Sequence, residues 1–206
     1  MEPFVLANES VRLSVPTVRD IDAIMLACQD SAIADWTVVP SPYRREDAEV
    51  FVQRFVPEGW SRGSAYNWAV REAGTADGPL LGMVGVHFEG RAGSPDHEQC
   101  AELGFWTAPA ARGKGLATEA GRLVVDWAFD PEGLGLAVLQ WVAYTGNWPS
   151  RRVAWNLGFR VEGTIRRYGL QRGRRRDAWV GTLLPGDPRE PNEEWTGPSE
   201  AHRSFG

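Results

Sequence analysis

The sequence predicts a single α/β domain of the α+β kind, built around a mixed central β-sheet. Its 206 residues suit one domain, and its 43% hydrophobic and 24% charged residues are typical of a globular protein with a sizeable core. Runs with strand-like and helix-like hydrophobic spacing follow one another over residues 10–184 in the order β-α-α-β-β-β-α-β-α-β-β. About four helices should therefore flank the sheet, and residues 185–206, with little apolar content, are expected to form a flexible C-terminal tail.

The first third of the chain predicts one strand and two helices. Residues 11–15 alternate with a period of two, as a half-buried strand does. Thr17 is expected to cap the helix that follows, and a second helix begins near Tyr43. Pro57 should end or kink this second helix, because its ring lacks an N–H and clashes with the preceding turn. The proline-rich residues 35–42 between the two helices are expected to be non-helical.

The rest of the chain predicts the larger part of the sheet and two more helices. The helices should cover residues 118–129 and 149–157, with Gly158 ending the second. A turn or hairpin loop is expected at residues 89–97, and a turn rich in Gly and Arg joins the last two strands. The expected strands are residues 66–72, 80–88, 100–107, 137–144, 159–167 and 178–184.

Charge is distributed unevenly along the chain. The formal net charge is −5, which does not favour nucleic acid as a general partner. Residues 151–176 nevertheless hold nine arginines and one acid, so this segment carries +8 and the remainder carries −13. A positive field within an acidic protein indicates a small or localised anionic partner.

Cysteine, histidine and hydropathy patterns argue against several classes of protein. Cys28 and Cys100 stand apart and are expected to be free, buried thiols. No segment approaches the ~18 apolar residues of a membrane span, and the N-terminus lacks a signal-peptide pattern, so a cytoplasmic protein is expected. No metal is expected, because no zinc-ligand spacing connects the three histidines, His87, His97 and His202.

The most informative stretch runs from Arg112 to Ala120, where a predicted strand gives way to a predicted helix. The start of a helix offers unpaired backbone N–H groups and the positive end of the helix dipole, which together favour an anion. Gly113 and Gly115 let the backbone approach a pyrophosphate without a Cβ clash, and Arg112 and Lys114 add positive charge. The stretch therefore predicts a phosphate-binding loop.

Two other glycine-rich motifs do not fit this stretch. A Walker A loop would need glycine at Ala108 and Ser or Thr at Gly115. A dinucleotide-binding fingerprint that starts at Gly113 breaks at Thr118. On this stretch alone, a plain helix entry with basic side chains in water is the alternative.

Three motifs together resemble the GNAT superfamily of N-acyltransferases. Arg112-x-x-Gly115-x-Ala117 resembles the Q/R-x-x-G-x-G/A signature with which that family binds the pyrophosphate of coenzyme A. Residues 101–107 resemble its bulged fourth strand, and residues 147–163 resemble the N-x-x-S…L-G-F-x-x-E-G segment of its RimJ/RimL branch. The motifs stand in the family's order and at its separations, and the resemblance covers roughly residues 10–184.

The resemblance implies an acyl-CoA site between two splayed parallel strands, the fourth and fifth, at residues 100–107 and 137–144. The pantetheine arm would insert like an extra strand, and its amides would pair with backbone groups of Phe105, Trp106 and Thr107. The side chains of Phe105 and Trp106 are expected to pack in the core instead. The other coenzyme-binding residues implied are Arg112, Gly113, Lys114, Gly115, Leu116, Ala117, Thr118, Asn147 and Ser150.

Acylation of an amine by a thioester needs a base for the ammonium and a proton donor for the departing thiolate. Glu102 is the first candidate for the base, because a carboxylate on the splayed strand could face the acceptor channel. By the resemblance, Ser150 lies near the coenzyme sulfur as proton donor or hydrogen-bond partner; capping of the following helix is the alternative role. Tyr144 and Tyr168 are reserve proton donors.

The function that the resemblance implies is transfer of an acyl group from acetyl-CoA, or from a related donor such as succinyl-CoA, to a primary amine by direct attack. The amine could belong to a protein N-terminus, a lysine or a small molecule, and a homo-oligomer is left open. The alternatives are a non-catalytic acyl-CoA-binding module and an RNA- or ribosome-associated module.

The arginine cluster near the C-terminus has three interpretations at this stage. It is a solvated hairpin face, an anchor for the coenzyme 3′-phosphate or an anionic acyl donor, or a docking patch for RNA or an acidic protein. The cluster consists of Arg166, Arg167, Arg172, Arg174, Arg175 and Arg176.

Overall fold

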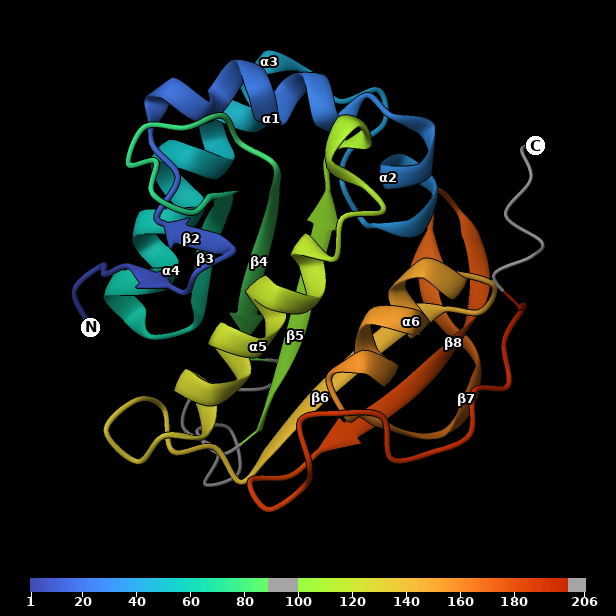
Figure 1. Cartoon of the computed structure of the whole chain (residues 1–206). Helices are drawn as coiled ribbons and strands as arrows, with labels where there is room; N and C mark the ends of the chain where they lie inside the picture. Colours follow the sequence, from blue (N-terminus) through green and yellow to red (C-terminus); the bar gives the residue numbers. More distant parts are fainter. Residues whose placement is uncertain (89–99, 200–206) are drawn as a thin grey trace.

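The computed structural model describes residues 1–88 and 100–199, so the turn expected at residues 89–97 lies outside the described residues. One mixed sheet has the strand order β1-β2-β3-β4-β5-β6-β8-β7 (Figure 1). Neighbouring strands are antiparallel except β5 and β6, which are parallel. The strands are Leu6–Ala7 (β1), Val11–Ser14 (β2), Ala65–Glu72 (β3), Gly82–His87 (β4), Cys100–Thr107 (β5), Val138–Tyr144 (β6), Arg160–Gln171 (β7) and Arg174–Leu183 (β8).

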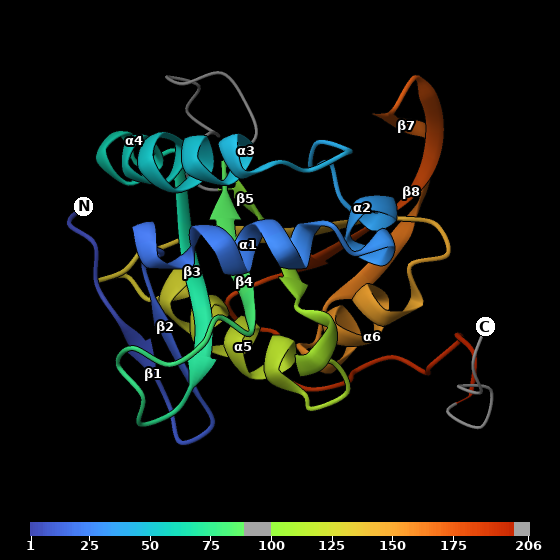
Figure 2. The same ribbon diagram turned by 90° about the horizontal axis from the view of Figure 1, so that it is seen from above.

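Helices cover both faces of this sheet (Figure 2). On one face α5 (Leu116–Phe129) packs against β4 and β5, with α6 (Trp148–Asn156) beside it. On the other face lie α3 (Arg45–Val50) and α4 (Val56–Arg62), and α1 (Ile21–Cys28) packs against α3. The predicted α/β domain around a mixed sheet is confirmed.

Alternation along β3 divides the apolar core between the two faces. Trp68 and Val70 join a cluster that includes Val124 of α5. Ala69, between them, points the other way and packs in a second cluster with Ile24 of α1. The centre of the sheet is thus buried on both faces.

Pro57 does not end the helix, which was one of the two outcomes predicted for it. Residues Phe51–Phe55 form a π-helical segment (η2) between α3 and α4, and the N–H of Val56 donates to the carbonyl of Phe51 five residues back. Pro57 follows this wide turn as an early residue of α4. In a regular α-helix the proline ring would clash with the carbonyl four residues earlier, and the missing N–H would leave that carbonyl unpaired. The π turn shifts the hydrogen-bond pattern at this point, so the helix continues past Pro57.

The segment predicted to be non-helical begins in a helix, α2 (Ser31–Trp36), which the sequence reading missed. Asp30 caps α2 by accepting a hydrogen bond from the N–H of Ile33 at 3.1 Å. Thr37 is already extended, so only the first two residues of the 35–42 segment depart from the prediction.

The C-terminal hairpin is longer than predicted. Strands β7 and β8 extend through most of the segment expected to be a Gly- and Arg-rich turn, and the actual turn is confined to Arg172 and Gly173, both at positive φ. The strand at Leu6–Ala7 was also missed, and it makes the splayed strands the fifth and sixth of the sheet.

The described part of the C-terminal segment lies against α6. Trp155 donates its indole N–H to the carbonyl of Glu193 at 2.8 Å. The guanidinium of Arg152 lies 3.7 Å from the ring centroid of Trp195. Aromatic and hydrogen-bonded contacts therefore hold residues near 193–195 to the domain.

A buried ion pair joins the start of α1 to the sheet. Arg71 of β3 donates through Nη2 to both carboxylate oxygens of Asp20, each at 2.8 Å, and both residues are buried. Asp20 also accepts the N–H of Thr17 at 2.8 Å, which completes the capping box before the helix. Arg71 further donates to the carbonyl of Gly78 at 2.6 Å, so its buried donors are paired.

Asp20→Ala should lower the free energy of unfolding by about 3–5 kcal/mol, because it leaves the Arg71 charge buried without its partner. Chemical denaturation measures this change. Arg19→Ala removes an ion pair to Asp77 whose side chains are 78% and 83% exposed, and should cost less than about 1 kcal/mol. Equal losses in the two variants would contradict a structural role for the buried pair.

Candidate active site

The parallel strands β5 and β6 separate partway along their length (Figure 1). They pair at three positions, of which the last is Glu102 with Gln140. Beyond it β5 continues on β4 as far as Thr107, while β6 continues on β8 as far as Tyr144. The facing edges of the two strands therefore present backbone N–H and C=O groups to the space between them, which suits an extended ligand with amide groups. The predicted splayed pair is confirmed.

The loop that follows β5 has the geometry of an anion site. Gly113 and Gly115 both have φ of +76°, in the left-handed region that favours glycine. Gly115 is the N-cap of the 14-residue helix α5, whose first N–H groups have no acceptor within the helix. A Cβ at either glycine would meet nothing within 4 Å, so backbone conformation rather than crowding within the chain calls for glycine here.

Arg112, at the start of this loop, is bound to α2. Its Nη2 donates to Oδ1 of Asp30 at 2.5 Å. This hydrogen bond is the main cause that holds the pKa of the Asp30 carboxyl below its usual value, and burial opposes it. The same carboxylate caps α2, so one acid joins the loop to that helix.

The segment after β6 carries Asn147 and Ser150 to the C-terminal end of the splay. Asn147 is buried and caps α6 by accepting the backbone N–H of Ser150 at 3.2 Å. The alternative of Ser150 as the cap is therefore wrong. The Ser150 hydroxyl instead accepts the indole N–H of Trp141 at 3.0 Å. Since indole N–H is a donor only, the serine proton stays available to another acceptor.

The other predicted residues surround the splay in different ways. The side chains of Phe105 and Trp106 pack against the two core clusters, one on each face, as expected. Tyr144 is buried at the end of β6, with its ring beneath the guanidinium of Arg176, 4.5 Å from the ring centroid. Glu102 lies at the apex, where the two strands part.

The arginine cluster is partly engaged within the chain, which none of its three interpretations foresaw. Arg172 donates to the carbonyl of Ala34 at 2.7 Å, and Arg176 donates to that of Asp35 at 2.5 Å. Gln171, at the hairpin tip, donates to the same two carbonyls at 3.2 and 3.1 Å. These contacts attach the end of the hairpin to α2.

Neither cysteine forms a disulfide, as expected, but only one of the two is buried. Cys28 lies in the core, and burial raises the pKa of its thiol to about 12. Cys100, the first residue of β5, is partly exposed, contrary to the expectation of two buried thiols. Among residues 1–88 and 100–199, no helix is long and apolar enough to cross a bilayer and no acidic, His or Cys cluster could hold a metal.

Sequence reasoning missed two polar residues beside the splay. His87 and Asn67 lie on β4 and β3, and Nε2 of His87 is 2.9 Å from Oδ1 of Asn67. His87 is the cross-strand neighbour of Glu102. The signal available in the sequence was His87, a polar residue at the end of an otherwise apolar strand. Its spacing from the other two histidines did not fit a zinc site and suggested no other role.

A splayed parallel pair with a glycine loop and a helix N-terminus after its first strand is the arrangement of an acyl-CoA-dependent N-acyltransferase of the GNAT type. Residues 10–160 match the acetyltransferase (GNAT) domain family, to which this chain therefore belongs. The family predicted from the motifs is confirmed.

Individual relatives agree with the RimJ/RimL-like pattern. Bacillus subtilis YdaF, provisionally named a ribosomal N-acetyltransferase, is 30% identical over 119 residues, which cover 58% of this chain but only 61% of YdaF. A Vibrio cholerae structure, provisionally described as a ribosomal-protein-serine acetyltransferase, matches with TM-score 0.74 and 23% identity over 90% of this chain and 100% of that one. Mycobacterium smegmatis RimJ in complex with CoA-disulfide matches with TM-score 0.72 and 22% identity over 89% of this chain and 90% of the RimJ chain. At these identities the structural likeness establishes the fold.

Gly115→Glu should weaken binding of coenzyme A by roughly 100-fold or more, because juxtaposed like charges cost several kcal/mol. Isothermal titration calorimetry measures the affinity. Gly74→Glu is a matched control, since Gly74 also has φ of +76° with nothing within 4 Å of a built Cβ, and it lies in the β3–β4 turn. Unchanged affinity in the Gly115 variant would contradict this placement of the pyrophosphate.

Proposed function

We propose that this protein transfers the acetyl group of acetyl-CoA to a primary amine at the N-terminus of a protein. The observation that carries the proposal is the loss of β5–β6 pairing after Glu102, directly beside a loop shaped for an anion. The strand edges suit the pantetheine amides, and the helix N-terminus suits the pyrophosphate. The names of the relatives, which refer to ribosomal proteins, support a protein as acceptor.

The donor is held along two segments of the chain. Backbone groups of Phe105, Trp106 and Thr107 pair with pantetheine, and a nearby N–H of β5 donates a hydrogen bond to the thioester oxygen, where negative charge develops. One such preorganised donor contributes about 3 kcal/mol to the barrier. The phosphates lie on the amides from Gly113 to Thr118.

Ser150 is the proton donor to the departing thiolate. Trp141 fixes the hydroxyl by donating to it, so the serine proton points toward another acceptor. Asn147 fixes the backbone on which Ser150 stands by capping α6. Tyr144 lies deeper, under Arg176, and has a supporting role at the wall of the splay.

The amine attacks the thioester directly, without an acyl-enzyme intermediate. Cys28 is buried in the core, where its raised pKa keeps it a thiol and therefore a poor nucleophile. Cys100 lies at the start of β5, before the strands separate. A positioned neutral amine therefore needs only a base and a stabilised oxyanion.

The test is a thiol-release assay with acetyl-CoA and succinyl-CoA as donors. The acceptors are a peptide that begins with serine and the same peptide with a blocked N-terminus and one lysine. Thiol release with acetyl-CoA and the first peptide, together with a product heavier by one acetyl group, is expected. Donor binding without turnover of either peptide would instead favour a non-catalytic acyl-CoA-binding module.

Ser150→Ala should lower kcat on the order of 100-fold, as expected for loss of a positioned proton donor, while the affinity for acetyl-CoA changes little. Ser150→Thr keeps the hydroxyl and should retain most of the activity. Steady-state kinetics and calorimetry separate the two effects. An alanine variant with wild-type kcat would show that the Trp141–Ser150 hydrogen bond is structural.

A further inference from the structure

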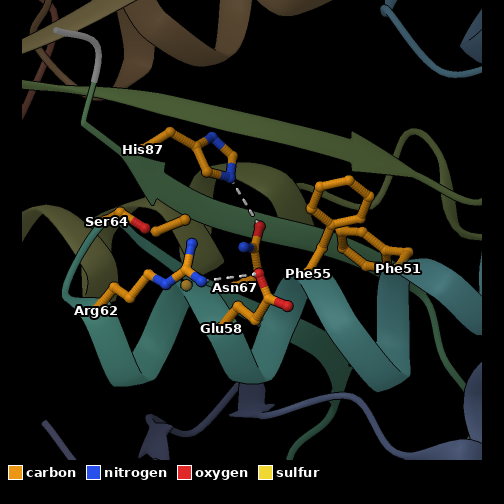
Figure 3. A pocket seen from close by; sticks show the side chains of 9 residues that line it. Phe51, Phe55, Glu58, Arg62, Ser64, Asn67 and His87 are labelled. Atoms are coloured by element: carbon orange, nitrogen blue, oxygen red, sulfur yellow. Dashed lines mark hydrogen bonds and ion pairs between the residues drawn. The ribbon is translucent and has the colours of Figure 1, made fainter. Parts of the chain in front are cut away.

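A pocket of about 360 Å³ opens between the α3–α4 helical segment and the sheet, on the face opposite α5 (Figure 3). Phe51 and Phe55, one helical turn apart, form an aromatic wall. Asn67 and His87 form the polar wall on the sheet, and Glu58 stands at the helix side. None of these residues is among those assigned to coenzyme binding.

We propose that this pocket receives the acceptor amine and that His87 is the base that removes its proton. The proposal rests on the function proposed above. It assigns to His87 the role that sequence reasoning gave to Glu102, and it places the amine on the opposite face of the sheet from α5.

The hydrogen bond to Asn67 fixes the protonation pattern of the His87 ring. Asn67 is buried, and a Cβ on Gly85 would come within 2.6 Å of its Oδ1, so the bare backbone of Gly85 makes room for the amide. An amide oxygen is an acceptor, so Nε2 of His87, 2.9 Å away, carries the ring proton. The lone pair of the neutral ring is then on Nδ1, the atom able to take a proton.

The position of His87 matches the place where the thioester would lie. A Cβ built on Gly104 of β5 would be 3.6 Å from both Nδ1 and Cε1 of His87, so the ring lies over that glycine. Gly104 is two residues past Glu102, where β5 has already left β6. The donor would therefore lie between the strands, with Nδ1 next to the strand that binds it.

The charges around the pocket suit an ammonium ion. Glu102 on β5 is the cross-strand neighbour of His87, and directly opposed side chains on antiparallel strands approach to about 5 Å. Glu58 on α4 is balanced by Arg54, at 3.2 Å, and by Arg62, at 3.6 Å. The cross-strand carboxylate of Glu102 thus favours a cation in the acceptor's position, and it favours the imidazolium form of His87 after proton transfer.

The proton balance is complete without any further reactant. Of the three ammonium protons, one goes to Nδ1 of His87 and then to water. The neutral amine forms the C–N bond as the C–S bond breaks. A second proton ends on the coenzyme sulfur through the hydroxyl of Ser150, and the third stays on the product amide.

The experiment compares wild-type protein and His87→Ala over pH 6–10, with acetyl-CoA and the serine-initiated peptide. At pH 7 kcat/KM should fall about 100-fold in the variant, as for loss of a general base. The loss should shrink as pH approaches the pKa of the amine, and added imidazole should restore part of the activity. Affinity for acetyl-CoA should be unchanged.

Phe55→Ala tests the pocket separately from the base. Phe55 is 61% exposed, so its removal spares the core. The variant should raise the KM for the peptide several-fold while its pH profile stays that of the wild type. An unchanged KM would place the acceptor elsewhere.

Three outcomes separate the inference from the proposed function. Wild-type protein that turns over neither peptide overturns the proposed function. The role of His87 is overturned if the wild-type protein turns over the peptide but the His87→Ala variant shows the same fold-loss of kcat/KM at every pH and imidazole restores no activity. Because the chain has three histidines, ¹⁵N NMR of the wild-type protein gives an independent reading: an Nδ1-protonated His87 would also overturn it.

Discussion

Hydrogen bonding between β5 and β6 stops after Glu102 and Gln140, and this interruption is the constraint on which the site depends. Backbone groups left unpaired at the facing edges must be satisfied by water or by a ligand. The two strands cannot close on each other, because β4 holds one along its length and β8 holds the other. A gap bounded by two intact antiparallel ladders is therefore a rigid recognition surface made of main chain, largely independent of side-chain identity.

Connectivity brings the remaining parts of the site to that gap. The carboxyl ends of parallel strands lie at the same edge of a sheet, so the segments that follow β5 and β6 are neighbours there. One segment becomes the glycine loop and the N-terminus of α5, and the other becomes the Asn147 cap with Ser150. The groups proposed to bind the coenzyme and the proposed proton donor thus meet without being close in sequence, while His87 lies on the face of the sheet opposite α5.

Local signals in the sequence predicted the fold and the backbone geometry of the glycine loop after β5. Gly113 and Gly115 are required by their own backbone angles, so a short motif was enough to locate them. The continuation of the helix past Pro57 was not predicted, because the π turn that accommodates the proline is visible only in the hydrogen bond from Val56 to Phe51. The pairing of His87 with Asn67 joins residues twenty apart on neighbouring strands, and that of Ser150 with Trp141 joins a helix to a strand. Such contacts follow from register, which a single sequence does not determine.

The short helix α2 contacts both the glycine loop after β5 and the β7–β8 hairpin. Asp30 at its start accepts a hydrogen bond from Arg112 of that loop, and the carbonyl of Asp35 near its end accepts from Gln171 and Arg176 of the hairpin. Each added helical residue turns the following carbonyls by about 100°. The length of α2 thus sets the spacing between the glycine loop and the hairpin. One inserted residue would misalign the hydrogen bonds at one end of the helix relative to those at the other.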